Sequence, residues 1–253
     1  MAILAVIPAR MAATRLPGKP LRDLGGEPLV IRVWQRVISL GVADECLIAT
    51  DSEAVAESAR RAGAAVEMTS DRHRSGTDRV AEVAALARYA RFETIVNVQG
   101  DEPFVARGAV EGAAQLVATG AFPLGTASAP LPLASIDRPD VVKVVRADDR
   151  RALYFSRAPI PFLRDRADAV ERAGVVRQHV GVYAYTRAAL AAWVALPTHA
   201  LERVERLEQL RPLAAGMAMG VADVAGEVHR GIDTEEDLLD ANAHWNAFTA
   251  ARS

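Results

Sequence analysis

Three cationic side chains occur in one short loop near the start of the chain. Arg10, Arg15 and Lys19 lie within residues 8–20, a polar segment with prolines and a glycine that directly follows the apolar run 3–7. Arginine offers forked donors to phosphate oxygens, lysine adds a mobile point charge, and backbone amides of a tight turn supply further donors. The spacing matches neither a Walker A loop nor a Gly-x-Gly-x-x-Gly motif. We therefore predict a polyphosphate-binding loop, with a solvated basic loop as the alternative.

Lysine is almost absent from the chain, which draws attention to the two lysines present. Of the 30 lysines and arginines, only Lys19 and Lys143 are lysines. A coding bias that converts tolerant lysines into arginines accounts for this excess of arginine. Under such a bias a lysine persists where a compact ammonium on a flexible stem does what a planar guanidinium cannot do. We expect a specific role for both lysines, with chance retention of one of them as the alternative.

Two aspartates follow apolar segments in positions that suit a divalent cation. Asp101 comes shortly after the apolar run 94–98, and Asp233 follows a glycine and an isoleucine. Mg²⁺ takes one or two protein carboxylates and completes its shell with substrate oxygens and water. Either aspartate could instead belong to a helix N-terminus, Asp101 as an N-cap and Asp233 or Thr234 within a capping box. The residues alone leave both hypotheses open.

The apolar pattern of the first hundred residues alternates between short strands and helices. Strands are predicted at residues 3–7, 46–49, 65–68 and 94–98, and helices at 29–38, 52–62 and 77–90. This alternation is typical of an α/β fold, a mostly parallel sheet flanked by helices and joined by right-handed crossovers. Ligands bind such sheets beyond the carboxyl ends of the strands. Because the polar segments 10–19, 71–78 and 99–103 all follow strands, we expect them to form one site.

The second half of the chain is less regular. Strands are predicted at residues 141–146, 152–156 and 179–185, and helices at 201–213 and 234–250. No internal repeat, low-complexity linker or charge block separates the two halves. We therefore predict a single domain over residues 1–253, with an inserted or appended section that faces the substrate.

Composition excludes several classes of protein. The 253 residues are 51% hydrophobic, enough for a sizeable globular core. A net charge of -2 supplies no general field for a polyanion, so nucleic-acid binding is disfavoured. The single cysteine, Cys46, excludes an intramolecular disulfide and a cysteine zinc cluster. Prolines and glycines interrupt the uncharged stretch 112–136, and no secretory leader is evident, so we expect no membrane span and a cytoplasmic location.

Together these segments resemble the 3-deoxy-manno-octulosonate cytidylyltransferases, also called CMP-Kdo synthetases. The resemblance runs nearly from end to end, and many ordered matches are far more specific than any one motif. The matching stretches are Ile7 to Arg10, Thr14 to Leu21, His73 to Arg79, Asn97 to Pro103, Val142 to Val145, Ala152 to Arg157, Pro159 to Pro161, His179 to Tyr183, Leu207 to Arg211, and Gly231 to Thr234.

The resemblance implies a Rossmann-like fold of the nucleotide-diphospho-sugar transferase type and a defined reaction. Members transfer CMP from CTP to the anomeric hydroxyl of 3-deoxy-manno-octulosonate (Kdo), release pyrophosphate and so activate Kdo for lipopolysaccharide synthesis. Within the expected single domain, the nucleotide-binding part would then cover residues up to about 130. The sugar-binding and dimerisation section would cover about 131–230. The resemblance further implies Mg²⁺ as cofactor and a homodimer.

The resemblance also assigns roles to particular residues. Arg10, Lys19 and Asp101 are implied as catalytic residues, and Asp101 and Asp233 as the Mg²⁺ ligands. The implied nucleotide-binding residues are Ala9, Arg10, Arg15, Lys19, Ser75, Gly76 and Arg79. The implied sugar-binding residues are Gln99, Arg157, His179, Tyr183, Glu208 and Gln209. A histidine before an apolar strand is also typical of a protein core, and this alternative applies to His179.

The chain departs from the family pattern at three positions. Ala13 replaces a serine, which removes a hydroxyl that could touch a phosphate, Asp78 stands where glutamate is common, and Glu235 stands where proline is common. The first departure puts one contact to CTP in question. Two alternatives remain: a cytidylyltransferase for another acid sugar, such as an amino-Kdo variant or a sialic acid, and a non-catalytic regulator that binds CTP or a sugar.

Overall fold

The computed structural model describes residues 1–12, 15–225 and 228–246. The chain divides into two compact units. The first unit comprises Ala2–Val105 together with the C-terminal segment from His229, and the second comprises Ala106–Val228. The prediction of one domain with a boundary near residue 130 stays a prediction.

The first unit is built on four parallel strands. These are β1 (Ile3–Ala9), β4 (Glu45–Thr50), β5 (Ala65–Met68) and β6 (Thr94–Val98). They pair in the order β6-β1-β4-β5, with Val6 beside Leu47 on one side and Ala5 beside Val96 on the other. Strand β6 is buried throughout and β1 nearly so, as expected for parallel strands covered on both faces.

Helices and a small ribbon complete the first unit. Its helices are α1 (Leu29–Ser39), α2 (Glu53–Arg61), α3 (Gly76–Ala85) and α9 (Glu235–Ala243), with the short 3-10 turns η1 (Lys19–Leu21) and η2 (Ala87–Tyr89). The ribbon consists of β2 (Asp23–Leu24) and β3 (Glu27–Pro28). Asn242 of α9 accepts a hydrogen bond from the backbone N–H of Gly25 at 2.8 Å, which attaches this C-terminal helix to the ribbon.

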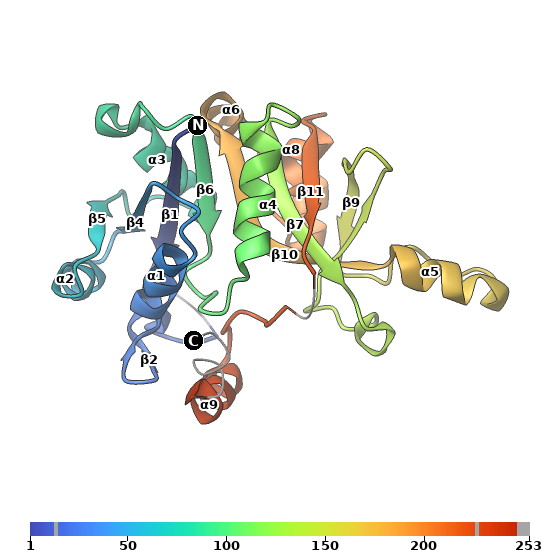
Figure 1. Cartoon of the computed structure of the whole chain (residues 1–253), viewed down its shortest axis with the longest axis horizontal. Coiled ribbons are helices and arrows are strands. Elements are labelled where there is room, and N and C mark those ends of the chain that lie inside the picture. Colours follow the sequence, from blue (N-terminus) through green and yellow to red (C-terminus); the bar gives the residue numbers. More distant parts are fainter. Residues whose placement is uncertain (13–14, 226–227, 247–253) are drawn as a thin grey trace. The chain divides into compact units, whose positions relative to one another are not determined.

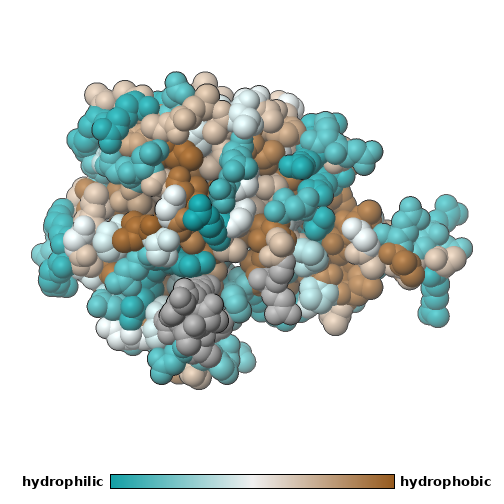
Figure 2. All heavy atoms as spheres, viewed as in Figure 1, coloured by the Kyte–Doolittle hydropathy of each residue, from teal (hydrophilic) through white to brown (hydrophobic). Residues whose placement is uncertain are grey.

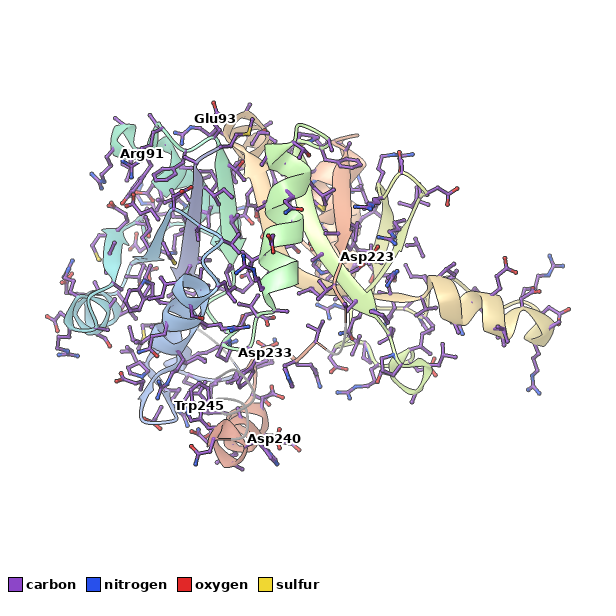
Figure 3. All side chains as sticks on the ribbon, viewed as in Figure 1. Arg91, Glu93, Asp223, Asp233, Asp240 and Trp245 are labelled. Carbon is purple, nitrogen blue, oxygen red and sulfur yellow. The ribbon has the colours of Figure 1, made fainter. Side chains whose placement is uncertain are left out.

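The second unit holds a mixed sheet. Its strands are β7 (Leu124–Pro130), β8 (Lys143–Arg146), β9 (Ala152–Ser156), β10 (Arg177–Thr186) and β11 (Met219–Asp223). Strand β7 pairs parallel with β11 and antiparallel with β10, and β8 pairs antiparallel with both β10 and β9. Arg146 and Arg177 both pair at 2.8 Å with Asp223, which is labelled in Figure 3.

The remaining helices of the second unit are short except for the first. They are α4 (Arg107–Ala118), α5 (Ala169–Val175), α6 (Arg187–Ala195), α7 (Ala200–Glu205) and α8 (Leu210–Ala214), with the turns η3 (Leu133–Ser135) and η4 (Arg166–Asp168). Helix α4 packs across β7, β10 and β11 (Figure 1). Gly125 makes this possible, because a Cβ there would lie 2.4 Å from the carbonyl oxygen of Ala113.

Strand β10 contains a bulge. Val180 is opposite Ala127, but the next paired residue, Tyr183, is opposite Thr126, so Gly181 and Val182 have no partner of their own on β7. A bulge bends its strand and changes the direction of nearby side chains. In this strand the bulge lies between His179 and Tyr183, two of the predicted sugar-binding residues.

The predicted strands agree closely with the structure, whereas three predicted helices need correction. The helix predicted at 77–90 ends at Ala85 and is followed by η2. The helix predicted at 201–213 is two helices, α7 and α8, because Arg206 adopts a left-handed conformation with φ of 55°. The last helix ends at Ala243, and residues 247–250 of its predicted range lie outside the described residues.

No helix within the described ranges is both long and apolar enough to cross a membrane.

Candidate active site

A cavity of about 440 Å³ opens at the carboxyl ends of the parallel strands of the first unit. It contains all seven predicted nucleotide-binding residues, both predicted metal ligands and one predicted sugar-binding residue, Gln99. The complete lining is Pro8, Ala9, Arg10, Ala12, Arg15, Leu16, Lys19, Pro20, Ser75, Gly76, Arg79, Gln99, Gly100, Asp101 and Asp233. The predicted convergence of the three polar segments is therefore confirmed.

Two loops at this sheet edge approach so closely that a side chain would not fit between them. A Cβ on Gly100, after β6, would lie 2.7 Å from the carbonyl oxygen of Pro8 in β1. A Cβ on Gly76, at the start of α3, would lie 3.1 Å from the Pro8 ring. These glycines let the Arg10 loop, the α3 N-terminus and Asp101 share one small space.

Lys19 joins the two predicted metal ligands. Its Nζ donates to Asp101 Oδ2 at 2.5 Å and to Asp233 Oδ1 at 2.8 Å. The guanidinium of Arg15 also pairs with Asp233, at 3.0 Å. The two carboxylates, 132 positions apart in the sequence, thus face a single point that a cation already occupies.

Backbone contacts bring Asp233 to this point. The N–H of Ile232 donates to the carbonyl oxygen of Asp101 at 2.9 Å, so residues 231–233 run beside the loop after β6. Gly231 permits the approach, because a Cβ there would lie 3.0 Å from Glu102 Oε1. Figure 3 labels Asp233 in the segment that leads into α9.

The capping alternatives have different outcomes at the two aspartates. The predicted capping box after Ile232 is present, with Thr234 and not Asp233 as the N-cap, whereas Asp101 caps no helix. Thr234 is the N-cap of α9, and its side chain forms a reciprocal capping box with Asp237. The helix that follows Asp101 begins at Arg107, with Ala106 as its N-cap. Both aspartate carboxylates therefore remain available for the cavity.

The charges in the cavity are strongly interdependent. Burial opposes the charge of Lys19, but the carboxylates of Asp101 and Asp233 outweigh it and raise the pKa of the ammonium. Burial, followed by the charges of Asp101 and Asp233, raises the pKa of Glu102 to about 8. Burial and two neighbouring carboxylates thus favour the neutral form of Glu102.

The residues present fit a magnesium ion. The carboxylates of Asp101 and Asp233 converge on one cationic atom, so their oxygens can be shared by one ion. Within residues 1–12, 15–225 and 228–246, no group of three or more histidine, cysteine, aspartate or glutamate residues is arranged to hold a metal. Mg²⁺ commonly takes one or two protein carboxylates and fills its other coordination positions with water and phosphate oxygens. Zinc takes three or four protein ligands.

The α3 N-terminus and the side chain of Arg79 form the opposite wall. Ser75 caps the helix in a capping box with Asp78, the aspartate that replaces the usual glutamate. Arg79 is nearly fully buried and pairs with Asp51 Oδ2 at 2.8 Å and with the hydroxyl of Thr69. Sequence analysis did not single out Asp51, although its place directly after β4, at the same sheet edge, was a usable signal.

The other predicted sugar-binding residues lie in the second unit, around β10. The rings of His179 and Tyr183 are 5.4 Å apart, and Phe155 packs edge-on against His179 at 5.0 Å. His179 Nε2 is 2.9 Å from the hydroxyl of Thr126. Burial lowers the pKa of His179 to about 3, so its ring is neutral near pH 7. The ring is half-buried and partnered on one side, which fits both a packing role and a ligand contact.

Three further residues of this predicted set have contrasting surroundings. The guanidinium of Arg157 donates to the carbonyl oxygens of Glu205, Pro139 and Arg206, so the backbone orients it. Glu208 lies near Tyr183 and contributes to the raised pKa of that phenol, after burial and Tyr185. Gln209, which directly precedes α8, is 3% exposed.

Ala13, the position at which the family pattern has serine, lies outside the described residues.

Comparisons with known proteins find similarity to cytidylyltransferases. A family model described as cytidylyltransferase matches residues 4–219. A 3-deoxy-manno-octulosonate cytidylyltransferase of Gemmatimonas aurantiaca is 61% identical over 253 residues, covering all of this chain and 98% of the relative. The protein of the same name from Xanthomonas campestris is 43% identical over 246 residues, covering 95% of this chain and 98% of that one.

Solved structures show the same fold. A CMP:2-keto-3-deoxy-manno-octonic acid synthetase complexed with CTP superposes with a TM-score of 0.89 at 35% identity, covering 98% of this chain and 99% of that one. A 4-diphosphocytidyl-2C-methyl-D-erythritol synthase from Anaerococcus prevotii reaches a TM-score of 0.60 at 17% identity, covering 97% and 98%, which supports the fold alone. Because the family model matches most of this chain and a full-length relative shares 61% identity with it, the chain belongs to the 3-deoxy-manno-octulosonate cytidylyltransferase family.

Proposed function

We propose that this protein transfers CMP from CTP to the anomeric hydroxyl of Kdo and releases pyrophosphate. The observation that carries the proposal is the cavity of the first unit, in which Arg10, Arg15 and Lys19 lie with two convergent aspartates. This combination suits a triphosphate, because cations bind phosphate oxygens and paired carboxylates take the accompanying metal. A family relative was solved with CTP bound.

Catalysis in this site consists mainly of positioning and charge stabilisation. The sugar hydroxyl attacks the α-phosphorus, the bond from that phosphorus to the bridging oxygen of the β-phosphate breaks, and pyrophosphate leaves with the added charge. Arg10, Arg15 and Lys19 line the cavity and stabilise that charge. Mg²⁺, when held by Asp101 and Asp233, adds positive charge beside the phosphates.

Recognition of cytosine and of the sugar follows from the remaining groups. The backbone around Ala9 and the N-terminal turn of α3, from Ser75 to Arg79, border the cavity and supply backbone groups for a cytosine ring. Kdo has a carboxylate and several hydroxyls, which call for a cation and for neutral polar side chains. Arg157, His179 and Gln209 offer this set in the second unit.

The decisive experiment measures pyrophosphate release with CTP and Mg²⁺ against a panel of acid sugars. Kdo should give the highest kcat/KM, with an amino-Kdo variant and a sialic acid well below it. Preference for another sugar would support the first alternative. CTP binding without turnover of any sugar would support a non-catalytic regulator.

The metal assignment has its own test in the variants Asp101→Asn and Asp233→Asn. Each should lower kcat at least about a hundredfold, because an interaction made with the transition-state charge is lost. Since neither side chain caps a helix, both variants should keep the thermal midpoint of the parent within a few degrees. Asp240→Asn, an exposed aspartate on α9, is the matched control and should stay fully active. Normal turnover by either site variant, or full activity in excess chelator, would contradict the assignment.

A homodimer formed through the second unit and a cytoplasmic location complete the proposal. Helix α5 and the loop before it carry Phe162 and Val170, which are 83% and 86% exposed, and Figure 2 shows a hydrophobic patch on this otherwise hydrophilic helix. Cys46, half-buried on β4, is a free cysteine, which suits a reducing compartment. Sedimentation equilibrium of the parent and of Phe162→Asp tests the dimer, since the charge should shift the equilibrium to monomer.

A further inference from the structure

The structure assigns Thr126, on β7, as the positioning residue that selects the tautomer of His179 and aims its free ring nitrogen at the sugar. This inference rests on the proposed assignment of His179 to the sugar site. Thr126 is completely buried, and its hydroxyl is the only hydrogen-bond partner of the His179 ring among the described residues. It therefore acts on the substrate only through the histidine.

The hydrogen bonds of Thr126 determine which ring nitrogen carries the proton. Its Oγ1 lies 2.8 Å from the carbonyl oxygen of Val182 and 3.4 Å from that of Val180. Carbonyl oxygens can only accept, and the Val182 oxygen makes the shortest contact with Oγ1, so we place the single hydroxyl hydrogen on the backbone side. Toward His179 Nε2, at 2.9 Å, the hydroxyl oxygen can then only accept. The imidazole must carry its proton on Nε2, which leaves Nδ1 as a bare acceptor.

The β10 bulge explains why a threonine is needed here. Val182 lies in the unpaired part of the bulge, so its carbonyl oxygen lacks a regular ladder partner on β7, and the Thr126 hydroxyl satisfies it. In a regular strand, the backbone advances about 13 Å over four residues. The ring centroids of His179 and Tyr183, four residues apart on β10, are only 5.4 Å from each other. One hydroxyl thus supports the bulge and orients the histidine within it.

The chemistry of an acid sugar matches the nitrogen that remains. A bare Nδ1 can accept a hydrogen bond from a sugar hydroxyl. In the opposite tautomer Nδ1 carries the proton and can only donate. A site with fixed acceptors rejects analogues that lack the matching hydroxyl, because its own polar groups are then left unpaired. Burial keeps the imidazole neutral across the working pH range, so this acceptor persists.

The first test reads the tautomer directly in the full-length protein. In ¹⁵N-histidine-labelled enzyme, bare and protonated ring nitrogens have distinct chemical shifts, and the signal of His179 among the five histidines is the one that disappears in His179→Gln. Wild type should show Nε2 protonated and Nδ1 bare. A proton on Nδ1 would overturn the inference, whatever sugar the enzyme uses and whether or not any variant folds.

The second test uses a matched pair of substitutions at residue 126. Thr126→Val keeps the shape and removes the hydroxyl, and should lower kcat/KM for Kdo about fivefold or more while CTP affinity changes less than about twofold. It should also mix the two tautomers. Thr126→Ser keeps the hydroxyl and should restore both the rate and the tautomer.

Ser128→Ala, which removes another buried hydroxyl two residues along β7, is the control for general damage to the strand. If it lowers kcat/KM for Kdo as much as Thr126→Val does, Thr126 has only a packing role and the inference fails. It also fails if Thr126→Val retains the wild-type tautomer and rate. Absence of pyrophosphate release by the wild type with Kdo would instead overturn the proposed function, and the tautomer measurement would still decide the Thr126 assignment.

Discussion

Lys19 donates to two carboxylates at once, and its size is what allows this. The side chain is 13% exposed, and Nζ lies between Asp101 and Asp233 at 2.5 and 2.8 Å. A guanidinium is larger and planar, and its terminal nitrogens reach farther than the ammonium, so it cannot occupy the same point. Retention of this lysine in an arginine-rich chain thus has a structural reason.

We predict that Lys19→Arg will not restore function although it keeps the charge. A displacement of about 1 Å at a reacting centre can cost on the order of a hundredfold in rate, and kcat should fall by about that much. Single-turnover kinetics with CTP and Kdo measure the effect. Arg22→Lys, an exchange at an exposed ion pair with Glu235, is the control and should remain active. A Lys19→Arg enzyme with most of the wild-type rate would show that any cation serves.

Strand β8 depends on the second lysine in a different way. Lys143 is fully buried, and its ammonium donates to the carbonyl oxygens of Arg138, Val141 and Arg157 at 2.9, 2.6 and 2.5 Å. The three N–H donors of the ammonium are matched by these three carbonyl oxygens, so all of its hydrogen bonds are formed. Burial, the largest influence, lowers the pKa of this ammonium. The lysine holds the end of β9 against the loop before β8.

Replacing Lys143 should therefore weaken the second unit itself. Lys143→Arg introduces a larger group with five donors, and Lys143→Met leaves three carbonyl oxygens unpaired. Each should reduce the free energy of unfolding by about 1–3 kcal/mol or more. Urea denaturation measures the loss, with Arg60→Lys on the exposed face of α2 as the control. A change within about 0.5 kcal/mol for both Lys143 variants would contradict this role.

The bulged strand β10 should give stability a dependence on pH. His179 has a folded-state pKa of about 3, against an ordinary value of 6.5. Between these values the unfolded chain binds a proton at this residue and the folded protein does not. The histidine therefore favours unfolding increasingly as the pH falls from about 6.5 toward 3.

We expect His179→Gln to remove this contribution. Its free energy of unfolding should fall less steeply than that of the wild type between about pH 6.5 and pH 4, whatever its absolute stability. Parallel urea titrations across that range measure the two slopes. His244→Gln, at an exposed position on the C-terminal side of α9, should leave the slope unchanged. Identical slopes for His179→Gln and the wild type would mean that the ring protonates normally in the folded protein.

The proposed nucleotide-binding residues lie in the first unit, and the proposed sugar-binding residues other than Gln99 lie in the second. Every residue that lines the cavity belongs to the first unit, whereas Arg157, His179 and Gln209 belong to the second. Substitutions in the second unit should therefore affect the sugar while CTP binding remains.

We predict that Gln209→Ala raises KM for Kdo or lowers kcat, with CTP affinity changed less than about threefold, well under 1.4 kcal/mol. Calorimetric titration with CTP beside steady-state kinetics separates the two effects. Gln115→Ala, an exposed glutamine of α4, is the control in the same unit. An equal loss of CTP affinity and of sugar turnover would place Gln209 in the nucleotide site or in the framework of the fold.

Local patterns were sufficient to predict most of the first unit. Apolar runs gave the strands β1, β4, β5 and β6 because buried parallel strands are continuous and apolar, and polar segments after them predicted the cavity. The motif resemblance identified the family. The second unit was harder: helix α4 and strands β7 and β11 were not predicted, since alanine-rich segments have little contrast between faces.

What the order of residues could not show is which distant groups share a site. Asp233 reaches Lys19 across 214 positions through one backbone hydrogen bond at Ile232 and one glycine, and no local periodicity encodes such a contact. The same holds for the β10 bulge, where Thr126 on a neighbouring strand donates to the carbonyl oxygen of Val182. Residue types thus determined the available chemistry. Tertiary structure decided which groups meet, because hydrogen bonds and charges act over a few ångströms of space irrespective of separation along the chain.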